Sequence, residues 1–417
     1  MSISPKRPVP FTSLRVDGQL LDATGIRRMA DDLVTHHGND NWALDLRDAI
    51  HQLIDDDTTL HARTSGTTGP PKVVDLDHRD LVSSARLTAA TFNLRPGDRA
   101  LHCLPCAFIA GKMMLVRGMV IGLDLHIIDP RGSVLENLDT SDRFAFSAMV
   151  PQQLHRAIQE DRPRVERQFD TILIGGGPVS MTLIEDLRSL RTRVAHTYGS
   201  TETLTPVAFR ESNAVTGPAE VFSAIGATHF GTDERECLIV HTPHLLVKEH
   251  VTNDLVELVD PHHFRWLGRA DNVILKGGRK IFPEQLEART AGVLPYPHFF
   301  TAMPDDRLGQ AVMLVIETDR SAEEVLPEVL DKVTSVLKRH EWPRRVTGVS
   351  TLDRNSSGEL IRPTMRSQHP GGRSTVGTSD STWPTITCGY RTRWWAGFGI
   401  PSHPAHGNPP PWPCSRS

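Results

Sequence analysis

Cysteine, tyrosine and long apolar runs are scarce in this sequence. The 417 residues include 5 Cys and 3 Tyr, and five thiols form no even, regular disulfide framework. We therefore expect a reduced, cytoplasmic location. The longest apolar run, near 113–125, is interrupted by Arg117, and the first residues contain no apolar stretch. The sequence thus predicts neither a membrane span nor a secretory signal.

An excess of either charge is also lacking. Lys+Arg total 46 and Asp+Glu total 50, which gives a net charge of −4. This balance excludes a strongly basic nucleic-acid binder and a polybasic protein of the membrane surface. The length, with 38% hydrophobic residues, predicts a large domain of a few hundred residues and a smaller one.

Between residues 99 and 243, short β-rich runs alternate with helical patterns. This alternation predicts an α/β fold with a parallel sheet covered by helices on both faces. We expect strands at 100–104, 123–128, 144–150, 171–175 and 193–198, with helices at 111–121, 151–160 and 180–190.

Further along the chain, strands are expected at 237–241 and 254–259. After Gly268 the pattern changes to a smaller α+β part. There Ser321 and Glu324 form a capping-box pattern, which predicts the start of a helix that runs towards His340.

Residues 369–417 differ in composition from the rest of the chain. They hold 8 Pro, 7 Gly, 4 of the 7 Trp and a single acidic residue. This Pro and Gly content is typical of low-complexity sequence, so we expect a disordered tail. Its tryptophans could instead dock on a partner, and an out-of-frame or read-through extension would have a similar composition.

The strongest local signal is the segment 64–72, Thr-Ser-Gly-Thr-Thr-Gly-Pro-Pro-Lys. Small hydroxyl residues and glycines let backbone N–H groups face outward, and a lysine follows, which is how a loop can hold polyphosphate. It is not a Walker P-loop, because Lys72 follows Pro71 rather than glycine. The alternative is a flexible surface loop.

Three more segments follow in order. Residues 172–178 are a strand that runs into a glycine turn, and 198–203, Tyr-Gly-Ser-Thr-Glu-Thr, follow another strand. Asp254 precedes Arg269 by fifteen residues. These two side chains could bind two ribose hydroxyls, or they could form an ordinary surface ion pair.

Together these segments resemble the adenylate-forming superfamily of acyl- and aryl-CoA synthetases, over roughly residues 60–365. Within it, the segments 103–114, 252–258, 266–273 and 277–285 are similar to the short o-succinylbenzoate–CoA ligases of menaquinone synthesis. The resemblance implies a large N-terminal domain with mainly parallel sheets covered by helices, plus a small mobile α+β C-terminal domain. The expected boundaries of the two domains are 1–269 and 270–368, and the tail expected from composition follows at 369–417.

The resemblance also implies a two-step reaction that uses ATP, Mg²⁺ and CoA. A carboxylate attacks the α-phosphorus of ATP, and CoA then displaces AMP from the acyl-adenylate. Beyond CoA and the small carboxylate substrate, no nucleic acid is expected as a partner, and a homo-oligomer is left open.

The resemblance assigns the following residues. The β- and γ-phosphates are held by Thr64, Ser65, Gly66, Thr67, Thr68, Gly69 and Lys72. The α-phosphate is bound by Thr201, and Mg²⁺ is coordinated by Glu202. Adenine is contacted by Tyr198, Gly199 and Gly176, and the ribose is bound by Asp254 and Arg269. Lys72, Thr201 and Glu202 are the catalytic assignments. Asp271 is the hinge, and Gly277 and Gly278 approach the CoA arm.

One position departs from the family. Glu359, in the segment 354–362, stands where the family has a catalytic lysine. The lysine bridges two anionic groups, and a glutamate reverses the sign of that interaction. At about 4 Å and an effective dielectric constant of 20, each unit charge contributes about 4 kcal/mol. Adenylation is therefore the half-reaction that this substitution affects.

The acid substrate implied by the resemblance is a dianion, whose second carboxylate needs a cation. Lys112 and Arg117 are the candidates, and Lys112 shares the expected pocket with Phe108 and Gly111. Arg117 could instead be an ordinary exposed residue. Cys103 and Cys106 also form a Cys-x-x-Cys pattern. We interpret it as the Leu-Pro turn of the subgroup rather than as a redox motif, which would require a lowered thiol pKa.

Three functions remain open. The first is a ligase that makes 2-succinylbenzoyl-CoA, and the second is a CoA ligase for another aryl or acyl acid. The third is a nucleotide- or acyl-adenylate-binding homologue with impaired adenylation.

Overall fold

The structure is a computed structural model that describes residues 11–38, 40–55, 59–63, 72–177, 179–204, 206–213, 221–354, 360 and 362. All of these belong to one compact unit, Met1–Arg366. The expected tail, 369–417, lies outside the described residues. Within the described part, no helix is both long and apolar enough to cross a membrane.

The described residues form helices and strands in a mixed order. The helices are α1 (Ala23–His36), α2 (Asn41–Ile54), α3 (His78–Phe92), α4 (Ile109–Arg117), α5 (Pro151–Gln168), α6 (Met181–Arg188), α7 (Pro283–Thr290) and α8 (Ala322–Val336). The strands up to residue 198 are β1 (Ser13–Val16), β2 (Gln19–Asp22), β3 (Thr59–Arg63), β4 (Val73–Asp77), β5 (Arg99–His102), β6 (Asp124–Ile127), β7 (Phe144–Met149), β8 (Phe169–Ile174) and β9 (Arg193–Tyr198). The later strands are β10 (Ala208–Glu211), β11 (Val221–Ala224), β12 (His229–Thr232), β13 (Cys237–His241), β14 (Glu249–Asp260), β15 (His263–Arg269), β16 (Ile274–Lys276), β17 (Arg279–Ile281), β18 (His298–Asp305), β19 (Gly309–Glu317) and β20 (Arg345–Val349).

Most of the described strands up to β15 share one sheet, in the order β12-β13-β14-β15-β11-β10-β9-β8-β7-β5-β6-β1-β2. The run from β9 through β8, β7, β5 and β6 to β1 is parallel throughout. From β9 to β12 each neighbouring pair is antiparallel. The α/β class and its parallel strands are confirmed, and the complete sheet is mixed.

The expected strands between residues 99 and 198 are all present, and β9 has the expected bounds. β7 and β8 are buried along most of their length, as parallel strands with both faces covered should be, whereas β6 and β9 also carry polar, partly exposed residues. The helix expected at 111–121 is α4 followed by a π-helical turn, Gly118–Gly122. The helix expected to end at 160 continues to Gln168 across a kink at Asp161.

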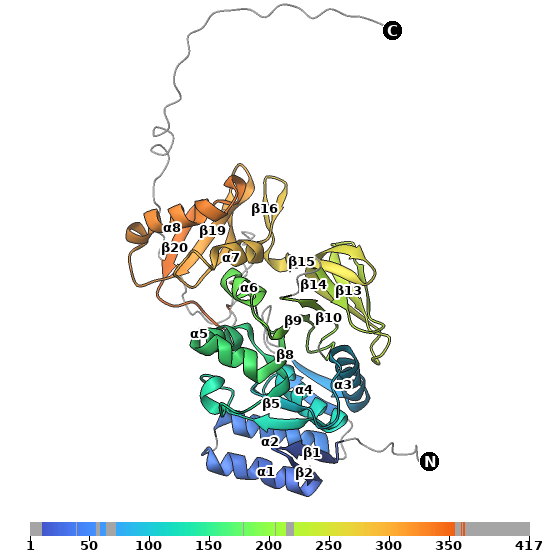
Figure 1. Cartoon of the computed structure of the whole chain (residues 1–417). Helices are drawn as coiled ribbons and strands as arrows, with labels where there is room; N and C mark the ends of the chain where they lie inside the picture. Colours follow the sequence, from blue (N-terminus) through green and yellow to red (C-terminus); the bar gives the residue numbers. More distant parts are fainter. Residues whose placement is uncertain are drawn as a thin grey trace, which may run out of the picture. The chain divides into compact units, whose positions relative to one another are not determined.

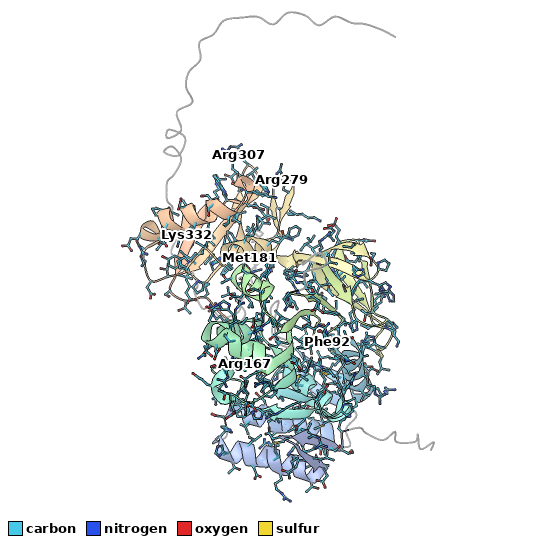
Figure 2. The ribbon with its side chains drawn as sticks, in the orientation of Figure 1. Phe92, Arg167, Met181, Arg279, Arg307 and Lys332 are labelled. Atoms are coloured by element: carbon cyan, nitrogen blue, oxygen red, sulfur yellow. The ribbon has the colours of Figure 1, made fainter. Side chains whose placement is uncertain are left out.

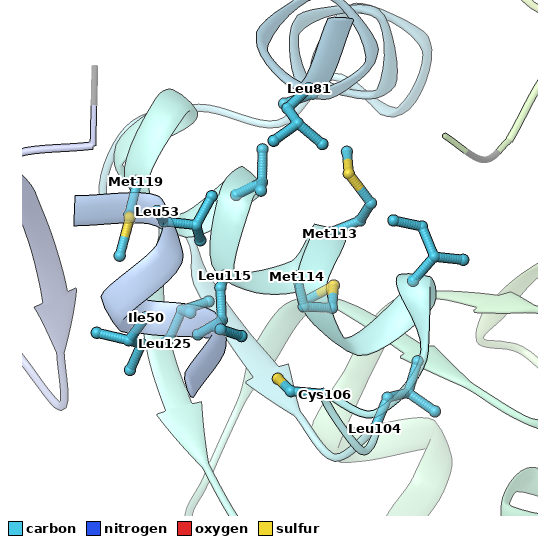
Figure 3. Packing of buried hydrophobic residues seen from close by; sticks show 14 of the residues in the cluster. Ile50, Leu53, Leu81, Leu104, Cys106, Met113, Met114, Leu115, Met119 and Leu125 are labelled. Atoms are coloured by element: carbon cyan, nitrogen blue, oxygen red, sulfur yellow. The ribbon is translucent and has the colours of Figure 1, made fainter. Parts of the chain in front are cut away.

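A large apolar core lies between the parallel strands and helices α2, α3 and α4. Ile50 and Leu53 from α2 meet Leu115 from α4 and Leu125 from β6 in this core (Figure 3). Gly111 lets α4 approach the preceding turn, because a Cβ there would lie 2.3 Å from the Pro105 carbonyl oxygen. In Figure 1, α1 and α2 lie side by side next to the β1–β2 hairpin.

The segment after β15 forms a second sheet, in the order β17-β16-β19-β18 with β20 beside β19. Its apolar residues, with those of α7 and α8, make a separate cluster that includes Ile274, Phe300 and Val329. As expected, Ser321 caps α8, and its hydroxyl accepts a hydrogen bond from the Glu324 N–H at 3.3 Å. The helix runs towards His340, as expected, but ends four residues before it. The helix stops at Val336 because Leu337 has an extended backbone, and a short 3₁₀ turn at Arg339–Glu341 follows.

Candidate functional site

The segment expected to hold phosphate joins two paired strands. β3 and β4 form an antiparallel hairpin in which Arg63 pairs with Val73. Thr64, Ser65, Gly66, Thr67, Thr68 and Gly69 lie outside the described residues. Lys72 is described and exposed, directly before β4. The structure therefore places both ends of this segment side by side, at the end of the hairpin where the segment connects β3 to β4.

The two other expected nucleotide segments begin at the carboxyl ends of neighbouring parallel strands. Gly176 follows β8 and Gly199 follows β9, and these strands pair with each other. Ligands of α/β sheets bind at this edge, where the carboxyl ends of the strands meet. Gly175, which the sequence did not single out, is required here, because a Cβ would lie 2.6 Å from the Thr197 hydroxyl. That hydroxyl donates a hydrogen bond to the Ile174 carbonyl at 3.0 Å.

The turn after β9 is held by its own hydroxyl groups. The Ser200 N–H donates to the Thr203 hydroxyl at 2.8 Å. The Ser84 hydroxyl of α3 donates to the Leu204 carbonyl at 2.9 Å, which ties the turn to the core. Thr201 is half-buried and Glu202 is exposed at the turn. Because neither residue is fully buried, both side chains are accessible to a ligand.

Tyr198, Asp254 and Arg269 meet although they come from three different strands. The Tyr198 hydroxyl donates to Asp254 Oδ2 at 2.6 Å, and Arg269 Nη1 lies 3.4 Å from Asp254 Oδ1. Asp254 and Arg269 are direct partners in the β14–β15 register. The sequence suggested the Asp254–Arg269 pair, but it gave no signal for the contact with Tyr198, which lies 56 residues away.

Burial sets the protonation of Tyr198. Burial first, and then the charge of Asp254, raise the pKa of Tyr198 well above its ordinary value. The phenol therefore remains a hydrogen-bond donor at neutral pH. Its ring packs edge-on against Phe264, with centroids 5.2 Å apart, and against Phe222 at 5.9 Å.

The residues available for Mg²⁺ suit an ion carried by a nucleotide. Among the described residues, no cluster of three or more His, Cys, Asp or Glu side chains is arranged to hold a metal. Glu202 offers one exposed carboxylate beside the threonine hydroxyls of its turn. Mg²⁺ is commonly bound by one or two carboxylates together with substrate phosphates and water. The donor set therefore fits an ion that takes most of its ligands from phosphate oxygens.

The residues expected to form the acid pocket lie at the start of α4. Phe108 is the N-cap residue of α4, and Gly111 packs against the turn before it. Lys112 is buried, and its ammonium donates to the His61 carbonyl of β3 at 2.5 Å. Burial lowers the pKa of Lys112, and the Asp45 carboxylate nearby opposes that shift. This ammonium thus already has a backbone partner and a neighbouring acid.

Arg117 lies at the end of the same helix and is more deeply buried. Its Nη1 contacts the Met114 sulfur at 3.6 Å. Burial lowers the pKa of Arg117 to about 10, so the guanidinium remains charged at neutral pH. α4 therefore carries two buried cations.

The Cys-x-x-Cys pattern is not a redox centre in this structure. Cys103 and Cys106 are both buried with free thiols. Burial raises the pKa of Cys103 to about 12, and it raises the pKa of Cys106 as well. A reactive thiol needs a lowered pKa and access to solvent, and neither cysteine has them.

The expected hinge and glycine turn are both described. Asp271 lies in a 3₁₀ turn and accepts a hydrogen bond from the Asn253 amide at 3.1 Å. Gly277 and Gly278 form the two-residue turn of the β16–β17 hairpin, both with positive φ, as a type I′ turn requires. A cavity of about 210 Å³ beside this turn is lined in part by Lys276 and Arg279. Figure 2 shows the Arg279 side chain at this hairpin.

Glu359 lies outside the described residues, but both ends of its loop are described. Arg354 and Leu360 form an antiparallel bridge. Arg362 donates to Glu284 at 2.7 Å and also contacts Glu287, both on α7. The Arg362 guanidinium is therefore already engaged by two carboxylates.

Comparison with known proteins identifies the family. The profile of the AMP-binding enzyme family matches residues 19–234. The long-chain-fatty-acid–CoA ligase FadD13 of Mycobacterium tuberculosis is 24% identical over 345 residues, covering 75% of this chain and 68% of the relative. The 2-succinylbenzoate–CoA ligase of Bacillus pumilus is 26% identical over 341 residues, covering 73% and 68%.

A solved structure extends this similarity to the fold. The acyl-CoA synthetase (AMP-forming)/AMP-acid ligase II-like protein from Dyadobacter fermentans is 32% identical, with a TM-score of 0.51. The match covers 76% of this chain and 92% of that one. The chain therefore belongs to the AMP-binding enzyme family, and its relatives place it among the AMP-forming acid–thiol ligases.

Proposed function

We propose that this protein is an ATP-dependent CoA ligase whose acid substrate is 2-succinylbenzoate and whose product is 2-succinylbenzoyl-CoA. One observation carries the proposal. Tyr198, Asp254 and Arg269 meet beside the threonine-containing turn that follows β9, at the carboxyl edge of the parallel strands. An aromatic ring, a carboxylate and hydroxyl donors at this edge suit an adenine nucleotide.

In this proposal the nucleotide is held from both ends. The hydroxyls and backbone of Thr64–Gly69, with Lys72, bind the β- and γ-phosphates, and Thr201 binds the α-phosphate. Tyr198, Gly199 and Gly176 contact adenine, while Asp254 and Arg269 bind the ribose. Glu202 and the phosphate oxygens would hold Mg²⁺, which neutralises phosphate charge when it is bound.

The reaction then has two steps. The substrate carboxylate attacks the α-phosphorus, and pyrophosphate leaves as the acyl-adenylate forms. The CoA thiolate next attacks the acyl carbon, and AMP leaves with the bonding electrons. Residues 1–269 carry the nucleotide site and 270–368 form a lid that turns about Asp271, which brings Gly277 and Gly278 to the CoA arm. Closure of such a lid excludes water, which would hydrolyse the mixed anhydride.

The choice of 2-succinylbenzoate rests on two supports. One curated relative carries that activity in its name, and Lys112, whose buried ammonium donates to the His61 carbonyl, directly follows the expected pocket residue Gly111 on α4. A dianionic acid needs a second positive charge that a fatty acid does not need. The fatty-acid ligase among the relatives supports the alternative that another acyl or aryl acid is the substrate.

Glu359 supports a second candidate function, a nucleotide- or acyl-adenylate-binding homologue with impaired adenylation. Loss of one electrostatic donor to a transition state commonly costs about 10²- to 10³-fold in rate, and a negative charge adds repulsion. Arg362, the described cation beyond this loop, is already paired with Glu284 and Glu287. The Arg362 guanidinium would therefore have to leave these two carboxylates to take the place of the lysine.

The experiment compares wild type with Glu359→Lys and Glu359→Gln. Each protein is mixed with ATP, Mg²⁺, CoA and 2-succinylbenzoate, and AMP and the thioester are followed by mass spectrometry. The ligase proposal predicts product from Glu359→Lys, with Glu359→Gln between it and wild type, because the amide removes the repulsion without adding a cation. If no protein forms product from 2-succinylbenzoate or from any other acid offered, while ATP still binds, the result favours the binding-homologue function.

A panel of acids tests the substrate. With Glu359→Lys, 2-succinylbenzoate should give the highest kcat/KM, followed by monocarboxylic aryl acids and then fatty acids. A higher value for a fatty acid would contradict 2-succinylbenzoate as the substrate and would leave the CoA ligase activity in place.

A further inference from the structure

The Tyr198 hydroxyl occupies a defined position on the carboxylate expected to bind ribose. It donates to Asp254 Oδ2 at 2.6 Å, a length typical of a charge-assisted hydrogen bond between a hydroxyl and a carboxylate. The Asp254 side chain is 12% exposed. A buried carboxylate with so short a hydrogen bond has little freedom to rotate.

The other carboxylate oxygen is less constrained. Arg269 Nη1 lies 3.4 Å from Asp254 Oδ1, which makes a weak contact. A carboxylate offers about four acceptor positions on its two oxygens. The phenol takes one of them, so Oδ1 and part of Oδ2 remain available to the two hydroxyls of a ribose.

The phenol itself is fixed by packing. Its ring contacts Phe264 and Phe222, and these two rings stack on each other with centroids 5.3 Å apart. Asp254 receives a second constraint from Thr252, whose hydroxyl accepts the Asp254 N–H at 3.1 Å and donates to the Leu238 carbonyl at 2.8 Å. Three strands, β9, β13 and β14, thus determine where the carboxylate points.

We propose that the Tyr198 hydroxyl is a positioning group that holds the Asp254 carboxylate in the orientation required to bind both ribose hydroxyls. This role belongs to the hydroxyl and is separate from any stacking of the ring on adenine. It rests on the proposed function, because it takes Asp254 to be the ribose ligand.

The test separates the hydroxyl from the ring. ATP and 2′,3′-dideoxy-ATP are titrated into wild type and Tyr198→Phe by calorimetry. Tyr198→Phe should bind ATP about tenfold more weakly, the effect of one hydrogen bond to a charged group, and bind the dideoxy nucleotide as wild type does. Equal weakening of both nucleotides, or no change in either, would overturn the positioning role.

A second pair of variants tests the same point in a neutral background. Asp254→Asn removes the buried charge, so the double variant Tyr198→Phe/Asp254→Asn leaves no carboxylate without its donor. Asp254→Asn and the double variant should bind ATP with affinities within about twofold of each other. A further tenfold loss in the double variant would assign the hydroxyl a role independent of Asp254.

A matched control removes a phenol elsewhere. The Tyr296 hydroxyl accepts a hydrogen bond from Arg320 at 3.2 Å, next to the second sheet. Tyr296→Phe should leave both titrations unchanged. If wild type itself does not bind ATP, the proposed function fails. If wild type binds ATP, but the ratio of its affinities for ATP and the dideoxy nucleotide is the same as in Tyr198→Phe, only the positioning role fails.

Discussion

Replacement of Gly111 by alanine should destabilise the protein, although helix propensity alone favours the change by about 1 kcal/mol. Gly111 lies in the first turn of α4, directly before Lys112. An added Cβ would lie 2.3 Å from the Pro105 carbonyl oxygen and 2.8 Å from that of Leu104. Both contacts involve backbone atoms, so relief requires a shift of α4 or of the turn before it.

The size of the effect follows from the balance of these two terms. Overpacking of a well-packed site commonly costs about 1–3 kcal/mol, and contacts this short with backbone belong at the upper end. Subtraction of the propensity gain leaves a net loss of about 2 kcal/mol. A loss of this size lowers Tm by about 4 °C in a chain larger than 250 residues.

The assay is thermal unfolding of Gly111→Ala, compared with a control variant in which another glycine is replaced by alanine. Gly231 in β12 is suitable, because the nearest atom to its added Cβ is His241 Nε2 at 3.6 Å, an ordinary contact. Gly231→Ala should shift Tm by about 1 °C or less. A Gly111→Ala protein as stable as wild type, or more stable, would refute the packing of α4 described above.

Two further predictions concern His102 and Lys112. Burial lowers the pKa of His102 from 6.5 to about 4, so this residue contributes stability above pH 6.5 that is lost as the pH falls towards 4. Between pH 7 and pH 5 the loss in free energy of unfolding is about 2 kcal/mol. Urea unfolding should therefore show that the stability of His102→Asn depends less on pH than that of wild type. Parallel curves of stability against pH for wild type and His102→Asn would contradict this. Lys112→Ala in the Glu359→Lys protein should raise KM for 2-succinylbenzoate about tenfold more than KM for benzoate. Equal changes for the two acids would mean that the ammonium only supports the His61 carbonyl.

Strands β5 to β9 of the parallel part could be predicted because each is a short segment with buried apolar residues bounded by turns, whereas the four-residue β1, which pairs parallel with β6, was not predicted. The strands from β10 onward were harder to predict, since their antiparallel pairing joins segments that carry weaker local patterns. β14 illustrates this: the sequence predicted 254–259, and the strand runs over Glu249–Asp260. Its first five residues are exposed or only partly buried, and only Val251 among them is apolar, so they lack the apolar signal of a buried strand.

The candidate site divides in a similar way. Asp254 and Arg269 could be identified from residue type and order, and the structure brings them together in one register pair. The Tyr198–Asp254 bond depends on how β9 and β14 are placed in the sheet, which no local pattern specifies. The steric demands on Gly111 and Gly175 arise from neighbouring backbone and from Thr197, so they also appear only in the folded chain.

The most direct test of the proposed function bypasses Glu359. Synthetic 2-succinylbenzoyl-AMP and CoA are mixed with the wild-type protein, and thioester and AMP are measured by mass spectrometry. This half-reaction does not need the missing lysine, so we predict equal amounts of AMP and 2-succinylbenzoyl-CoA, formed at a similar rate by wild type and by Glu359→Lys. Absence of thioester with both proteins, above the rate without protein, would contradict the assignment as a CoA ligase for this acid.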